Sequence, residues 1–61
     1  MKLQDITALM DGPDEVIVWE MEGDACNELH CGEVQAMPDG LLGREVTDLA
    51  PGHYVLGIYI R

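Results

Sequence analysis

The chain has few basic residues and no serine. Three bases, Lys2, Arg44 and Arg61, stand against twelve acidic residues, and the formal net charge is −9. Residues 3–43 carry ten of the acids and no base. Because nucleic acids and anionic membranes are bound through clustered Lys or Arg, the composition excludes both as direct partners. The absence of serine excludes a serine nucleophile, and no glycine pattern resembles a phosphate-binding loop.

Long apolar runs are also missing, so no segment approaches the length of a membrane span. Lys2 is followed by Gln4 and Asp5 rather than by an apolar stretch, which predicts no signal peptide and a cytoplasmic location. In that compartment Cys26 and Cys31 are expected to be reduced. The 61 residues predict a single domain, residues 1–61. A chain this short buries only about 60% of its unfolded surface, so its stability is expected to be marginal.

The most strongly β-forming run is Glu-Val-Ile-Val-Trp-Glu-Met, and both of its faces are apolar. Strand side chains alternate, so Val16 and Val18 point one way. Ile17, Trp19 and Met21 point the other way. One buried face is enough for a strand in a small sheet, so the second apolar face is expected to need a partner.

Hydrophobic spacing predicts a short helix over residues 2–10, with Leu3, Ile6, Leu9 and Met10 on one face. Gly and Pro in residues 11–14 end this helix. Strands are predicted over residues 15–21, 28–35, 44–49 and 54–60.

Three details of this arrangement can be predicted. A bulge at Gly32 would correct the phase of the second strand. The last strand is expected to turn Leu56, Ile58 and Ile60 toward the core. Ala-Pro-Gly-His at residues 50–53 matches a type II turn.

These elements predict an α+β fold. An N-terminal helix would pack on a small antiparallel sheet of about four strands, formed by two hairpins joined by a short helical turn within residues 37–43. The alternative is a small, partly open β-barrel.

The sequence resembles uncharacterised small acidic proteins encoded in phages and prophages of Gram-positive bacteria. The likeness lies in a Leu-x-x-Ile-x-x-Leu-Met helix, an Asp-x-x-Glu-Val-x-Val strand, a Gly-to-Val block and an apolar terminus, here residues 3–10, 14–18, 32–46 and 56–60. The resemblance implies a fold type and a phage or prophage context, and it implies no activity. In such proteins the position of Ile17 is often polar, so the second apolar face is particular to this chain.

Metal-ligating residue types occur at Cys26, His30, Cys31 and His53. Four such ligands can hold zinc tetrahedrally, which would stabilise a small domain. The Cys-x-x-x-His-Cys spacing is not an established zinc pattern, and neighbouring residues of a strand face opposite ways. The competing interpretation is a core Cys31, a surface His30 and a Cys26 in a loop. We therefore expect no cofactor, and the zinc-stapled binding module is kept as an alternative.

The leading prediction is a non-catalytic interaction protein rather than an enzyme. Its interaction face would contain Ile17, Trp19, Met21, Val55 and Tyr59, provided that the first and last strands are neighbours. The partner would be a second copy, giving a homodimer, or another protein. If the face is instead covered by residues 37–42 or by closure of a barrel, it has only a structural role. A further alternative is an acidic mimic of nucleic acid that inhibits a basic host or phage protein.

Overall fold

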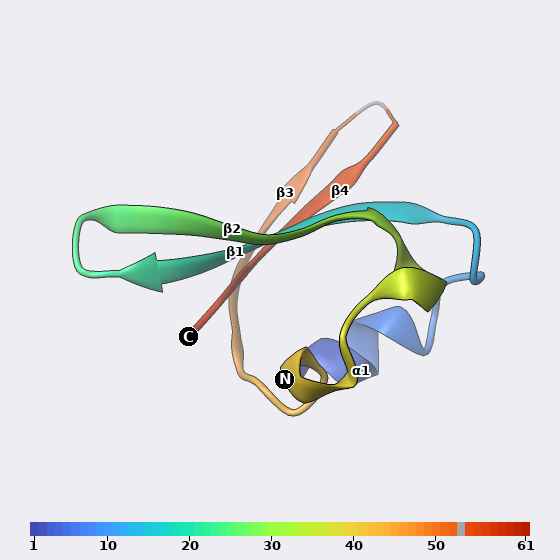
Figure 1. Cartoon of the computed structure of the whole chain (residues 1–61), viewed down its shortest axis with the longest axis horizontal. Coiled ribbons are helices and arrows are strands. Elements are labelled where there is room, and N and C mark those ends of the chain that lie inside the picture. Colours follow the sequence, from blue (N-terminus) through green and yellow to red (C-terminus); the bar gives the residue numbers. More distant parts are fainter. Residues whose placement is uncertain (53) are drawn as a thin grey trace.

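The computed structural model describes residues 1–52 and 54–61 and shows an open sheet covered on one face by short helical segments (Figure 1). His53 lies outside the described residues. Along the chain the elements are α1 (Leu3–Thr7), β1 (Glu15–Glu22), β2 (Ala25–Glu33), the 3₁₀ turns η1 (Val34–Ala36) and η2 (Asp39–Leu41), β3 (Val46–Pro51) and β4 (Leu56–Ile60). This arrangement confirms the predicted α+β class.

The strands lie in the order β2-β1-β4-β3. Both predicted hairpins form, because β1 pairs antiparallel with β2 and β3 pairs antiparallel with β4. The two central strands, β1 and β4, are parallel, with Val16 opposite Leu56 and Trp19 opposite Tyr59. The expectation of a purely antiparallel sheet is therefore wrong, and the sheet is mixed. Because β2 and β3 remain at its edges, the sheet also does not close into the alternative barrel.

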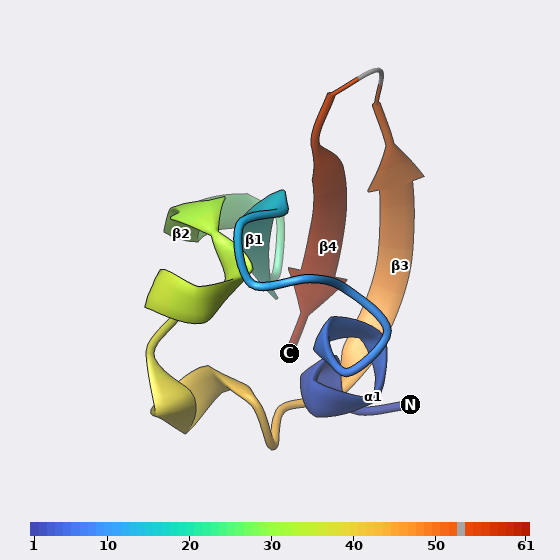
Figure 2. The ribbon, with the colours of Figure 1, turned by 90° about the vertical axis from the view of Figure 1, so that its right-hand side faces the viewer.

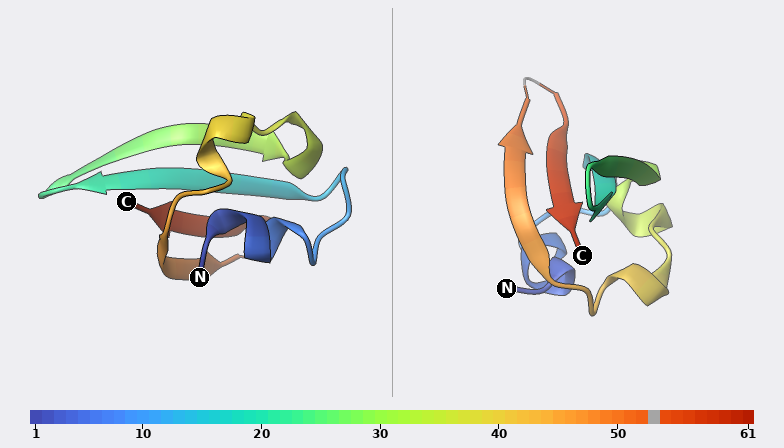
Figure 3. Two further views of the ribbon diagram at one scale, coloured as in Figure 1. Left: turned by 90° about the horizontal axis from the view of Figure 1, so that it is seen from below. Right: turned by 90° about the vertical axis from the view of Figure 1, so that its left-hand side faces the viewer.

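The parallel central pair follows from the path of residues 34–45. β2 ends beside the start of β1, where Glu33 pairs with Glu15. The chain then returns along the sheet through η1 and η2 and enters β3 at Val46, opposite Ile60 at the far end of β4. Figure 2 shows this path from β2 through the 3₁₀ turns to β3, and it sends β4 in the same direction as β1 (Figure 3, left). Hairpin signals are local, so they do not specify the direction of one hairpin relative to the other.

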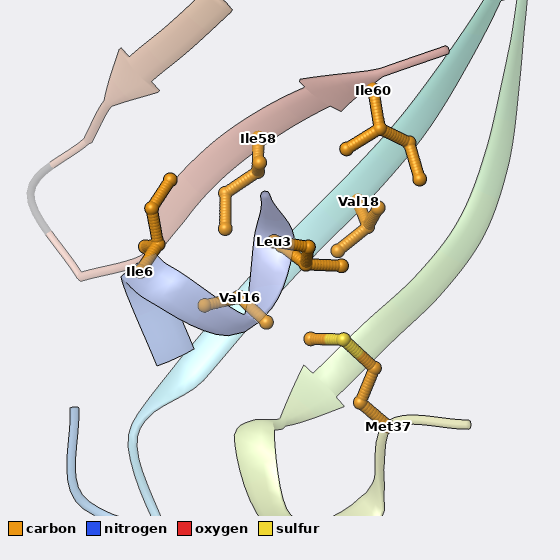
Figure 4. Packing of buried hydrophobic residues seen from close by; sticks show 7 residues of the cluster. All are labelled: Leu3, Ile6, Val16, Val18, Met37, Ile58 and Ile60. Carbon is orange, nitrogen blue, oxygen red and sulfur yellow. The ribbon is translucent and has the colours of Figure 1, made fainter. Parts of the chain in front are cut away.

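The core lies between α1, the 3₁₀ segment and one face of the sheet (Figure 4). Alternation along β1 and β4 places apolar side chains on that face, and Ile58 and Ile60 are fully buried as predicted. Leu56 is partly buried and packs against them. The buried residues are Leu3, Ile6, Val16, Val18, Met37, Ile58 and Ile60.

Helix α1 is shorter than predicted. Asp5 stabilises the N-terminus of the helix, because the Asp5 carboxylate accepts a hydrogen bond from the Lys2 amide at 2.9 Å. Leu3 and Ile6 are buried, but the helix ends at Thr7 and Leu9 is 88% exposed. The helical spacing therefore fails at Leu9, since the chain has already left the helix there.

β2 contains a bulge, but the bulge is at Leu29 and not at Gly32. Val18 pairs with His30 and Trp19 pairs with Glu28, so Leu29 is the extra residue. Gly32 instead adopts a positive φ of 143°, a conformation that favours glycine. Leu29 packs against the core.

The second hairpin also differs from its prediction. β3 runs to Pro51, which pairs with Leu56, so Pro51 belongs to a strand and not to the centre of the predicted type II turn. Proline is tolerated there because β3 is an edge strand and its missing N–H need not join a ladder. The Gly52 amide donates to the Val55 carbonyl at 3.0 Å. His53, the last residue of the predicted turn, lies outside the described residues.

Candidate interaction face

The sheet has a covered face and an open face. α1 and the 3₁₀ turns lie on the same side of the strands (Figure 3). Met37, Leu41 and Leu42 pack with the core on that side, so the 37–42 segment does not cover the second apolar face of β1. We call the opposite side the open face. In the part of the chain that the structure describes, its strand residues are Glu15, Ile17, Trp19, Met21, Cys26, Glu28, Cys31, Glu33, Asp48, Ala50, Gly57 and Tyr59.

An aromatic pair lies at the centre of the open face. The Trp19 and Tyr59 rings are stacked with centroids 5.0 Å apart and an interplanar angle of 26°. Both residues are half-buried. The pair forms because β1 and β4 are neighbours and place these residues opposite each other. The predicted face required the first and last strands to be neighbours, and this requirement is met.

Gly57 makes room for the Trp19 ring. A Cβ at position 57 would lie 2.7 Å from Cζ3 of Trp19 and 3.1 Å from the Ala50 carbonyl oxygen. The indole therefore lies across the buried glycine of the neighbouring strand, where no side chain separates it from the backbone. This contact holds the ring against the sheet, and it leaves part of the ring exposed.

Four of the five residues predicted for the interaction face come together there. Ile17 is half-buried, and Met21 is 42% exposed at the end of β1. Val55 precedes β4, so no strand pairing assigns it to this face, and with Met10 and Leu56 it lines a shallow cavity of about 280 Å³.

Sequence reasoning missed the part of the open face that the edge strands supply. Glu28 lies opposite Trp19, and Asp48 lies opposite Tyr59. In antiparallel pairs, residues directly opposite each other share a face. Each assignment follows a register shift, between Val18 and Trp19 in one hairpin and between Val46 and Asp48 in the other. Simple alternation along the sequence cannot locate such shifts.

The candidate zinc ligands are not brought together. Cys26 and Cys31 are exposed free thiols on the open face, opposite Met21 and Ile17. The interpretation of Cys31 as a core residue is wrong, because the bulge at Leu29 turns it outward. His30 lies on the covered side, and its Nε2 is 3.0 Å from the Glu33 carbonyl oxygen. No group of three His, Cys, Asp or Glu side chains within residues 1–52 and 54–61 is arranged to hold a metal. His53 lies outside these residues.

The acidic side chains do not form one surface. Asp5 caps α1, Asp24 lies in the β1–β2 turn, and Asp39 lies in η2. Glu20 forms an ion pair with Arg44 on the covered side. Four acids, Glu15, Glu28, Glu33 and Asp48, lie on the open face. Because a mimic of nucleic acid would display carboxylates along one surface at phosphate-like spacing, this scatter disfavours that alternative.

Comparison with protein families, curated proteins and solved structures gave no match. The resemblance to small phage and prophage proteins therefore stays a prediction. Among the described residues, no helix has the length and apolar character needed to cross a membrane.

Proposed function

We propose that this chain is a non-catalytic interaction protein that binds a basic protein through its open face. The supporting observation is the Trp19–Tyr59 stack, which lies on the side of the sheet opposite α1 and the 3₁₀ turns. Trp, Tyr and Met are enriched at the centres of protein interfaces, and Met21 extends this apolar area at 42% exposure.

Charge favours a basic partner over a second copy. The formal net charge is −9, and Glu28 and Asp48 lie on the open face itself. Two copies meeting face to face would bring these like charges together, which opposes association at low salt. The same charges attract a basic protein. The homodimer expected from the sequence stays a prediction that the solution mass tests.

The first experiment is the molar mass by light scattering, with and without a chelator. We expect a monomer that the chelator does not change. A dimer that Met21→Glu dissociates would overturn the basic partner in favour of self-association. A fold lost on adding chelator would favour the zinc-stapled module.

The second experiment identifies the binding surface. Random peptides displayed on yeast are selected for binding to the wild-type protein, and the selected peptides are tested against Met21→Glu. The control is Leu9→Glu, which makes the same change in charge at a position that is 88% exposed and follows α1. We expect Met21→Glu to abolish binding and Leu9→Glu to retain it. Peptides that bind both variants equally would contradict the use of the open face.

A further inference from the structure

We infer that one row of residues across the open face binds arginine side chains of the partner. The aromatic row consists of Glu28, Trp19, Tyr59 and Asp48, one residue from each strand in the order β2-β1-β4-β3. This inference rests on the proposed function, because it specifies what the same face recognises. The row has an acid at each end and two aromatic rings between them.

The rings provide surfaces on which a planar cation can lie. Trp19 and Tyr59 are half-buried and in contact with each other. A guanidinium group is planar and weakly hydrated, so it stacks on aromatic faces more readily than an ammonium group. Trp is the most favourable ring for this contact. The central part of the row is thus suited to arginine more than to lysine.

The two acids complete the row as counter-charges. Neighbouring strands lie about 4.8 Å apart, so Glu28 is one strand from Trp19 and Asp48 is one strand from Tyr59. A guanidinium over either ring is then close enough to donate hydrogen bonds to the adjacent carboxylate. Asp48 Oδ1 already accepts the Leu49 amide at 2.8 Å, and the carboxylate has further acceptor positions.

The chain's own Arg44 does not occupy this row. Its guanidinium pairs with Glu20 on the covered side, and its Nε donates to the Arg61 carbonyl at 3.0 Å. The carboxylate of Glu20 is thus matched within the molecule. Within residues 1–52 and 54–61, Glu28 and Asp48 on the other side of the sheet form no ion pair, so their carboxylates can meet a partner's cations.

The test uses Trp19 as its own reporter, since it is the single tryptophan of the chain. Its fluorescence is followed while a blocked arginine-rich peptide is added, and then a lysine-rich peptide of equal length and charge. We expect the arginine peptide to bind at least about fivefold more tightly, as ring stacking predicts. Binding should weaken as salt is raised.

Charge variants separate the row from general attraction. Glu28→Gln should lower the affinity for the arginine-rich peptide about threefold, which corresponds to the loss of one exposed ion pair. Glu22→Gln makes the same change on β1, but alternation places it on the covered side, so it should have a smaller effect. Equal affinity for the two peptides, or equal losses in the two variants, would overturn the inference. If Met21-sensitive peptides without arginine are nevertheless selected, the proposed function stands and only the arginine row fails.

Discussion

The two faces of the sheet carry apolar side chains from the same strand but use them differently. On the covered face, Val16 and Val18 are fully buried beneath α1. On the open face, Ile17 and Trp19 are half-buried by their neighbours within the sheet. The covered face therefore supplies the fold with a core, whereas the open face retains apolar area that the helical segments do not cover. Apolar character by itself does not distinguish these two roles, but coverage by the rest of the chain does.

The largest effect should come from removing a core side chain. Ile58→Ala deletes a fully buried side chain and should lower the free energy of unfolding by about 2–5 kcal/mol. The matched variant is Ile17→Ala on the open face, with an expected cost of about 1 kcal/mol. Urea denaturation measures both. Equal costs would mean that the open face contributes to folding as much as the core does.

The next largest loss of stability should come from disturbing the packing of the Trp19 ring against Gly57. Gly57→Ala places a methyl group 2.7 Å from the Trp19 ring, and we expect a loss of about 1–3 kcal/mol from overpacking. In a Trp19→Ala background the destabilisation caused by Gly57→Ala should be smaller, because the ring that the added methyl group displaces is no longer present. The control is Gly43→Ala, where no atom outside residues 42–44 lies within 4 Å of the added carbon. A Gly57→Ala variant as stable as Gly43→Ala would contradict the packing of Trp19 over Gly57.

A smaller effect is expected for the ion pair on the covered side. The Arg44 and Glu20 side chains are 31% and 28% exposed, so solvent screens their attraction. A double-mutant cycle with Arg44→Gln and Glu20→Gln should give a coupling of about 0.5–1 kcal/mol. The coupling should fall as salt is added. A coupling that does not respond to salt would show that the pair is not electrostatic in the way the geometry indicates.

The smallest effect on stability should occur at the end of the open face. Met21→Ala removes a side chain that is 42% exposed, and the free energy of unfolding should change by no more than about 0.5 kcal/mol. The same variant should weaken binding of the selected peptides. Thermal unfolding and peptide affinity, measured on one sample, check both statements. A clear loss of stability would place Met21 with the core rather than with the interaction face.

Much of the fold is predictable from local sequence patterns. Alternation identifies β1 and β4 and assigns Val16, Val18 and Ile58 to one face, because a single strand determines its own periodicity. The parallel pairing of β1 with β4 is not local, since it depends on how residues 34–45 return along the sheet. The packing of Leu41 and Leu42 against the core holds this return path in place, and local sequence patterns do not predict that packing.

The candidate site is predictable in part for the same reason. Ile17, Trp19 and Met21 follow from alternation within one strand. Glu28 and Cys31 do not, because the bulge at Leu29 changes which residues of β2 face outward. Residues on β1 can thus be assigned from sequence, whereas their neighbours on the edge strands require the register.

The position of β4 in the sheet has a consequence for how the chain folds. β4 follows the other three strands along the chain, yet it lies between β1 and β3 in the sheet. Within the described sheet, the β1–β4 ladder is the only strand pairing that joins the two hairpins. This ladder joins Val16 to Leu56, so a long loop must close before the central pair can form. Each hairpin can form early from local contacts, but the core stays incomplete until Ile58 and Ile60 are in place. Val16 and Val18 therefore lack their contacts with Ile58 and Ile60 until β4 has paired with β1. We expect slow folding for a chain of this length, in one cooperative step.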